Sequence, residues 1–249
     1  MATHSKTETG HAVNVDHFEK LKNIVKGEAS YNPADPNLTI LNLEATLTSE
    51  KNAVDDLIAA KISWKNAVNK REIAFDPLSR LVTKIVNAAA ACEVSEQFIA
   101  DLKSLQKKIQ GVRSSPAIEV LDDPETPDDE TFKSISASQM GYVNRTDNFN
   151  MMVQMLAGEP NYLPNEVEVQ VVTLQAYLAD LQAANTKVNE EEPAVISGIE
   201  ARNDILYKSS TSGNELQGKV KKYAKAVFGT DNHITKRLLA LKFTKPKGV

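Results

Sequence analysis

The chain has 249 residues, of which 41% are hydrophobic and 25% are charged, and its ten Gly and ten Pro are fewer than average proteins of this length carry. This composition excludes collagen-like, low-complexity and loop-rich all-β classes and favours an all-α globular protein. The formal charge of −4 gives no overall attraction to polyanions, and the single cysteine, Cys92, excludes an intramolecular disulfide.

The first predicted element is a short amphipathic helix over residues 14–26, which ends at Gly27. Its apolar side is formed by Phe18, Leu21, Ile24 and Val25. The following stretch, residues 31–36, predicts a turn in which Asp35 caps the next helix and Pro36 takes its first position.

A long helix is predicted up to Phe75, because no Gly or Pro follows Pro36 before that residue. At 1.5 Å per residue it is about 55 to 60 Å long. Its apolar side recurs every 3.5 residues on average, which is the period of left-handed helix packing. The positions on this side are Ile40, Leu43, Leu47, Glu50, Val54, Leu57, Lys61, Trp64, Val68, Arg71 and Phe75.

Two shorter helices complete the first half of the chain. Asp76 and Pro77 are expected to serve as the cap and the first residue of one, and Ser95 as the cap of another that ends near Gln110. Residues 111–135 then contain three prolines and seven acidic residues, with no base between Glu119 and Glu130. Such a segment predicts an exposed linker.

The second half of the chain repeats the first at an offset of 131 positions. Residues 10–71 align with residues 141–202 without a gap, and both segments place Gly-Glu-x-x-Tyr-x-Pro identically. Shared helical periodicity alone does not explain that motif, so we interpret the pattern as a tandem duplication. It gives a first copy over residues 1–110, a linker over 111–135 and a second copy over 136–249.

In the second copy, the long helix contains Pro193, which we interpret as a bend because the aligned residue of the first copy lies in an uninterrupted helix. A polar loop over residues 208–213 follows. Asn214 and Asp231 are expected to cap the last two helices.

The closing residues carry a family resemblance. Arg202-Asn203 with Leu206-Tyr207, the run from Val220 to Gly229, and Leu241-Lys-Phe-Thr-Lys-Pro-Lys247 resemble the signature of an uncharacterised family of bacterial helical proteins. The opening residues 1–12 are similar to the start of that family. The loop over residues 208–214 departs from the pattern, in which a shorter turn is expected. The resemblance implies one helical architecture and no activity, cofactor or catalytic residue.

The sequence offers no constellation typical of a metal centre, nucleophilic catalysis or a phosphate-binding loop. The four histidines, at positions 4, 11, 17 and 233, form no His-x-x-x-His pair, and Cys92 follows four alanines, where a small thiol suits packing. We therefore expect no catalytic residue, metal or cofactor.

Arg71 and Arg202 occupy equivalent positions on the apolar side of the two long helices. One interpretation is an anion clamp formed by the two guanidinium groups. The interpretation that we favour is structural, in which each arginine reaches solvent along its stem or pairs with a buried acid. Lys61 and Glu192 are equivalent as well and carry opposite charges.

We expect a non-enzymatic structural or interaction protein that self-associates or binds another protein, in the cytoplasm, because its opening residues lack a secretory signal. One alternative is a membrane-active or toxin-like helical protein, although no apolar run is long enough to span a bilayer. Another is a nucleic-acid-associated protein that uses the basic tail from Lys219 to Val249, which has nine bases and one acid. Nucleic acid, membrane and small-molecule partners are not expected.

Overall fold

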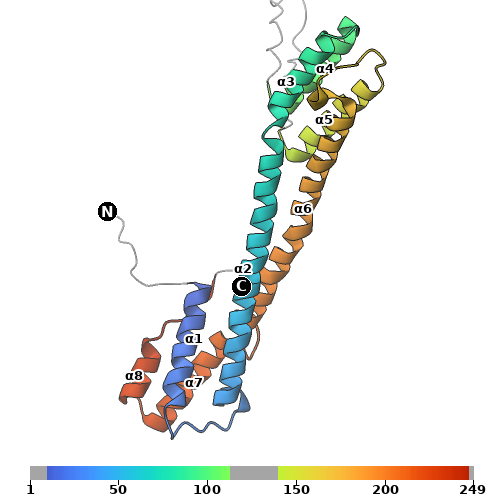
Figure 1. The fold of residues 1–249 in the computed structure, drawn as a ribbon. Helices are drawn as coiled ribbons and strands as arrows, with labels where there is room; N and C mark the ends of the chain where they lie inside the picture. Colours follow the sequence, from blue (N-terminus) through green and yellow to red (C-terminus); the bar gives the residue numbers. More distant parts are fainter. Residues whose placement is uncertain (1–9, 113–139, 247–249) are drawn as a thin grey trace, which may run out of the picture. The chain divides into compact units, whose positions relative to one another are not determined.

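A computed structural model describes residues 10–112 and 140–246, and throughout these ranges the protein is all-α, without a strand (Figure 1). This confirms the predicted fold class. No helix in these ranges combines the length and the apolar run that crossing a bilayer requires. The α-helices are α1 (His11–Lys26), α2 (Ile40–Phe75), α3 (Leu78–Ala90), α4 (Glu96–Gln110), α5 (Tyr142–Ala157), α6 (Val171–Asn203), α7 (Gly213–Phe228) and α8 (His233–Ala240).

Three short turns that are not α-helical adjoin the two long helices. The 3-10 turns η1 (Pro36–Leu38) and η2 (Val167–Val169) precede α2 and α6, and the π-helical turn η3 (Asp204–Lys208) follows α6. The predicted start at Pro36 is therefore wrong by one short turn: Asp35 caps η1 by accepting from the amide of Asn37, and α2 begins at Ile40.

Some helix ends match the sequence predictions and others differ. Ser95 caps α4 by accepting from the amide of Phe98, as predicted. The cap of α7 is Ser212 rather than Asn214: the Ser212 hydroxyl accepts from the amide of Glu215, which is the spacing of a capping box.

The start of α8 and of α3 also differs from the predictions. Asn232, not Asp231, caps α8 by accepting from the amide of Ile234. At the start of α3 no side chain caps the helix, and Pro77 precedes its first residue. Asp76 instead pairs with Arg80 at 3.5 Å.

The chain folds into two compact units, and each unit takes helices from both halves of the sequence. Unit 1 comprises the described parts of Met1–Lys65 and Glu190–Val249, with α1, the first part of α2, the last part of α6, α7 and α8. Unit 2 comprises the described parts of Asn66–Asn189, with the last part of α2, all of α3, α4 and α5, and the first part of α6. The predicted copies therefore each contribute to both units. Apart from Gly111 and Val112, the predicted linker lies outside the described residues.

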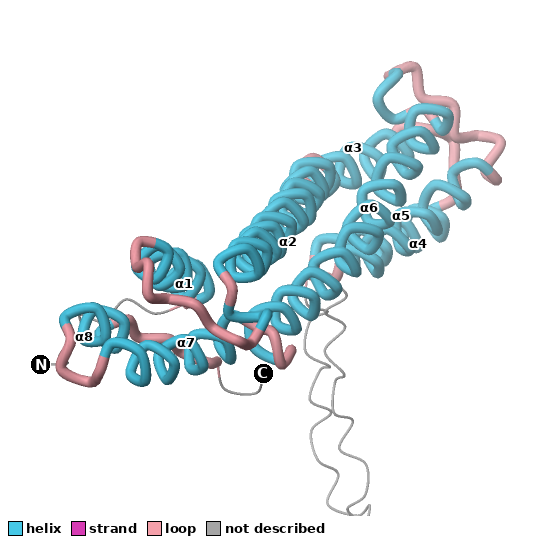
Figure 2. Tube along the Cα trace, turned by 90° about the horizontal axis from the view of Figure 1, so that it is seen from below, coloured by secondary structure: helices cyan, strands magenta, loops and turns pink. Residues whose placement is uncertain are grey.

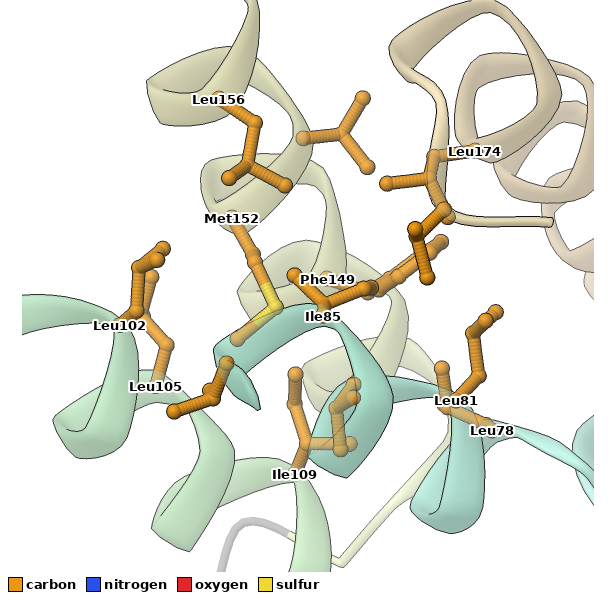
Figure 3. Close-up of a cluster of buried hydrophobic side chains, with 14 of the residues drawn as sticks. Leu78, Leu81, Ile85, Leu102, Leu105, Ile109, Phe149, Met152, Leu156 and Leu174 are labelled. Atoms are coloured by element: carbon orange, nitrogen blue, oxygen red, sulfur yellow. The ribbon is translucent and has the colours of Figure 1, made fainter. Parts of the chain in front are cut away.

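Unit 2 has a core of buried aliphatic and aromatic side chains (Figure 3). α4 packs against both α3 and α5, and η2 packs against α3. The core residues with no exposed surface include Leu78, Ile85, Leu102, Ile109, Phe149, Met152 and Leu181. Burying each such side chain contributes about 1.5–3 kcal/mol, so these helices are held together mainly by this cluster.

Unit 1 has a separate core beneath α1, α7 and α8, which lie side by side in Figures 1 and 2. Its most deeply buried residues include Phe18, Leu21, Leu43, Tyr207, Val220 and Leu238. The core also contains a carboxyl group, that of Glu50, which is only 2% exposed.

The predicted apolar side of the long helices is buried or half-buried along most of its length. Lys61 and Glu192 on this side are exposed, and α6 runs through Pro193 as one helix. The buried members of the pattern include Leu43 and Leu57 on α2, and Leu174, Leu181 and Val188 on α6.

Paired features support the predicted duplication at the level of single turns. α1 and α5, η1 and η2, and the starts of α2 and α6 are each separated by 131 positions. The Tyr31 hydroxyl donates to the Leu38 carbonyl at 2.9 Å, and the equivalent Tyr162 hydroxyl donates to the Val169 carbonyl at 2.8 Å. The duplication itself stays a prediction from the sequence.

Candidate functional site

Arg71 belongs to unit 2, where its guanidinium stacks on an aromatic ring at the start of α5. Its Cζ lies 4.1 Å from the centroid of Tyr142, which meets Phe75 edge to face with the centroids 4.9 Å apart. Arg145 Cζ lies 5.5 Å from the Phe75 centroid on the same cluster. Such cation–π contacts contribute about 0.5–1 kcal/mol each at exposed sites, so the cluster helps to hold α5 against α2 within unit 2.

Arg202 belongs to unit 1, is only 9% exposed, and binds its sequence neighbour. Its Nη2 and Nε donate to Oδ1 of Asn203 at 2.6 and 3.1 Å. Burial, followed by the charges of Arg202 and Lys61, lowers the pKa of His11. The lowered pKa favours the neutral imidazole, whose Nδ1 lies 2.8 Å from the Tyr207 hydroxyl.

The two arginines thus have different surroundings in different units. Arg71 is held by stacking on the Tyr142 ring, and Arg202 by the amide oxygen of Asn203. Neither contact is with an acid, and both interpretations of these positions stay predictions from the sequence.

The predicted histidines and the cysteine are dispersed. His4 lies outside the described residues, His11 and His17 make separate contacts, and Cys92 is a half-buried free thiol. In the part of the chain that the structure describes, no three His, Cys, Asp or Glu side chains come together in a way that would hold a metal ion.

A groove of unit 2 lies between α3 and the start of α6, and we call it the tyrosine groove. Its volume is about 630 Å³. It is lined by Pro77, Arg80, Leu81, Lys84, Glu168, Thr173, Leu174 and Tyr177. Apolar walls with a few charged groups at the edge are typical of surfaces that bind other molecules.

Tyr177 closes one side of the tyrosine groove. Its hydroxyl donates to the carbonyl of Ala74 at 2.7 Å, in the last turn of α2, where helix carbonyls lack a partner within the helix. Burial raises the pKa of Tyr177 to about 12, so this hydroxyl stays protonated at neutral pH and keeps its donor role.

A second groove of about 600 Å³ adjoins the first, and we call it the cysteine groove because Cys92 lines it. It lies between the end of α3 and the loop before η2. Lys84 and Glu168 line both grooves and form an exposed ion pair at 2.8 Å. An exposed pair of this kind contributes about 0–1 kcal/mol, so a partner that binds there can displace it at little cost.

Three large apolar side chains stand out beside these grooves. Leu163 is 78% exposed, Val167 is 68% exposed and Val172 is 69% exposed. Leu163 lines the cysteine groove itself, whereas Val167 and Val172 are exposed residues of the same segment, in η2 and in the first turn of α6. We call these three residues and the two grooves the unit 2 surface.

Unit 1 has a groove at the equivalent place, but its lining is polar. This groove of about 470 Å³ lies between the start of α2 and the segment after α6. Three pairs of equivalent positions, each separated by 131 residues, line this groove and the tyrosine groove. Asn37, Asn42 and Thr46 in unit 1 correspond to Glu168, Thr173 and Tyr177 in unit 2. At one pair of equivalent positions, unit 1 has the small hydroxyl side chain of Thr46 and unit 2 has the aromatic ring of Tyr177.

Sequence reasoning considered Pro77 and Cys92 only for helix initiation and packing, and it did not predict the unit 2 surface. The repeat alignment drew attention to positions that agree between the copies, whereas the grooves are distinguished by positions that differ. A signal was present in Leu163, Val167 and Val172, which are apolar residues near the start of a helix and outside its buried side.

Comparison with protein-family models, with curated proteins and with solved structures gives no match for this chain. The candidate site is therefore interpreted from its own residues.

Proposed function

We propose that this protein is a non-enzymatic interaction protein, a helical assembly subunit, that self-associates through the unit 2 surface. The observation that carries this proposal is the exposure of three large apolar side chains, Leu163, Val167 and Val172, in the segment that also contributes to the walls of the two grooves. We keep the cytoplasm as its proposed compartment, where the free thiol of Cys92 would stay reduced.

A symmetric dimer needs a surface that is complementary to itself, because the same residues face one another across a two-fold axis. We expect the unit 2 surface to meet this requirement, with Leu163 of one copy entering a groove of the other. Its charges are also of both signs, with Arg80 and Lys84 near Glu166 and Glu168. Removing apolar area from water contributes roughly 25 cal/mol per Å², which favours burying the three exposed side chains.

The first test is the mass of the particle in solution. Size-exclusion chromatography with light scattering should show more than one chain per particle at micromolar concentration, at both low and physiological salt. A strictly monomeric protein under both conditions would contradict the proposal.

The second test places a charge on the unit 2 surface. Val172→Asp should raise the dissociation constant at least tenfold, because an unpaired carboxylate would have to be desolvated in the interface. The matched control is Leu41→Asp. Leu41 is the equivalent residue of unit 1 and is 76% exposed, and the equivalent groove of that unit has a polar lining, so its substitution should leave association unchanged. Equal effects of the two substitutions would argue against unit 2 as the site.

A further inference from the structure

The residues after α8 lie in unit 1 as an extended segment, Leu241–Pro246, which we call the strap. Its main chain is bound by one side chain of α1. Asn14 Nδ2 donates to the Thr244 carbonyl at 2.7 Å, and Asn14 Oδ1 accepts from the Thr244 amide at 3.1 Å. The Asn14 side chain is buried, and both of its polar atoms bond to the strap backbone. Its Nδ2 also donates to the Tyr207 hydroxyl.

Further contacts fix the strap along its length. His17 Nδ1 donates to the Lys242 carbonyl at 2.6 Å, and Lys221 Nζ of α7 donates to the Leu241 carbonyl at 2.8 Å. The Phe243 ring lies between these two side chains, 5.9 Å from the His17 ring and with Lys221 Nζ 4.8 Å from its centroid.

This is the way in which proteins bind extended peptides. Four hydrogen bonds are made to main-chain groups of the strap, one at Leu241, one at Lys242 and two at Thr244. The side chains alternate: Leu241 and Phe243 are half-buried, whereas Lys242 and Thr244 are exposed. Main-chain hydrogen bonds then provide affinity, and pockets for alternate side chains provide specificity.

We propose that the face formed by α1 and α7 is a peptide-binding groove, and that the strap of a second copy of this chain can occupy it in place of the chain's own strap. The strap follows the eight-residue helix α8, so it can leave without breaking a long element. An identical strap from another copy makes the same bonds, which is the basis of exchange between protomers. This proposal concerns unit 1 and does not depend on the unit 2 surface.

The first experiment uses a fluorescent synthetic peptide of residues 241–249 and a full-length variant with a disabled strap. Phe243→Ala with Thr244→Pro removes the ring and the amide that Asn14 binds, while the groove keeps its residues. The peptide should bind this variant saturably in fluorescence anisotropy, and at least tenfold more weakly to the unmodified chain, whose own strap competes. Adding Asn14→Ala to the variant should weaken binding at least fivefold.

A folded strap-disabled variant that binds the peptide no better than the unmodified chain would overturn the proposal. Circular dichroism establishes whether the variant is folded. Hydrogen exchange of the unmodified chain gives a second measurement. The protection factor of an amide is its intrinsic exchange rate divided by its observed rate. The protection factor of the Thr244 amide should be at least 100-fold smaller than that of the Leu21 amide in α1. Equal protection would show that the strap opens only when the unit unfolds, and would also overturn the proposal.

Exchange between copies is tested by complementation. One chain carries Asn14→Ala, which impairs the groove, and the other carries the disabled strap; both also carry Val172→Asp to suppress association through unit 2. Mixed, they should form a one-to-one pair in light scattering, while each alone stays monomeric. If the mixture stays monomeric although the peptide binds, the second copy is excluded as the source of the strap.

Discussion

Glu50 is a carboxyl group buried in the core of unit 1. It accepts from the amide of Gly213 at 3.0 Å, at the first residue of α7, and burial raises its pKa to about 8. The backbone hydrogen bond from Gly213 opposes this rise. The equivalent position of unit 2 is Leu181, which has no exposed surface. Unit 1 therefore contains an ionisable group where unit 2 contains a purely apolar one.

The raised pKa predicts how stability depends on pH. The folded state holds the Glu50 proton more tightly than the unfolded state, in which the pKa of a Glu side chain is about 4.3. The protonated carboxyl therefore contributes fully to the free energy of unfolding below that pH, and this contribution is lost as the pH rises through about 8. Glu50→Gln removes this dependence and still offers an oxygen to Gly213. Denaturant unfolding at pH 5 and pH 9 gives the free energy of unfolding of both proteins. The difference between the variant and the unmodified chain should shift in favour of the variant by at least about 1 kcal/mol from pH 5 to pH 9. A constant difference between the two proteins would contradict the raised pKa.

Gly213 is required by the approach of the Glu50 side chain. A Cβ at this position would overlap with Oε1 of Glu50 and would lie 2.8 Å from its Cδ. Gly213→Ala should therefore destabilise the protein by about 1–3 kcal/mol, as expected for overpacking. Gly218→Ala, on the same helix, meets nothing within 4 Å and should stabilise the protein by about 0.5–1 kcal/mol. Thermal unfolding of the two variants distinguishes these opposite signs.

At the scale of single elements, the turn before each long helix depends on a tyrosine. Tyr31 and Tyr162 are buried, and their hydroxyls donate to carbonyls seven residues further along the chain. Replacing either tyrosine with phenylalanine leaves a carbonyl without that donor and should cost about 1 kcal/mol. Chemical unfolding of Tyr31→Phe and of Tyr162→Phe should give similar losses. A loss in only one of them would show that the two turns are not energetically equivalent.

The sequence predicted the elements better than their ends. The 3.5-residue period and the scarcity of breakers were sufficient to predict both long helices. The caps were harder, because several suitable polar residues stand side by side before α7 and α8, and tertiary packing selects among them. Ser212 is 1% exposed and fits the capping box with Glu215, whereas Asp231 is fully exposed and lies 3.8 Å from Lys236.

At the scale of the whole molecule, the repeat pattern could not predict which helices share a core. A helical stripe shows that a side is buried, but not against what. Leu43 and Phe75 lie on the same side of α2, yet they belong to different cores, Leu43 to that of unit 1 and Phe75 to that of unit 2. The grooves were also beyond prediction, because their walls come from segments as distant as Leu81 and Tyr177.

The division of each long helix between two units predicts how fragments behave. Fragments 1–112 and 113–249 each contain only part of either core, because each unit takes helices from both halves of the chain. Each fragment alone should therefore have less helical circular dichroism than its share of the intact chain, and the mixture should recover the missing signal. Full helicity in the separate fragments would show that each half folds independently.

The sharing of α2 and α6 between the units also bears on descent. If the predicted duplication took place, a shorter ancestor with one copy of the repeat would have had no complete interior of its own, since its first helix would pack with the last helices of another molecule. Such an ancestor would have been an obligate pair of identical chains. Fusion of two genes would then have joined both partners in one polypeptide, leaving each half free to diverge, as a polar hollow in one place and an apolar hollow in the other.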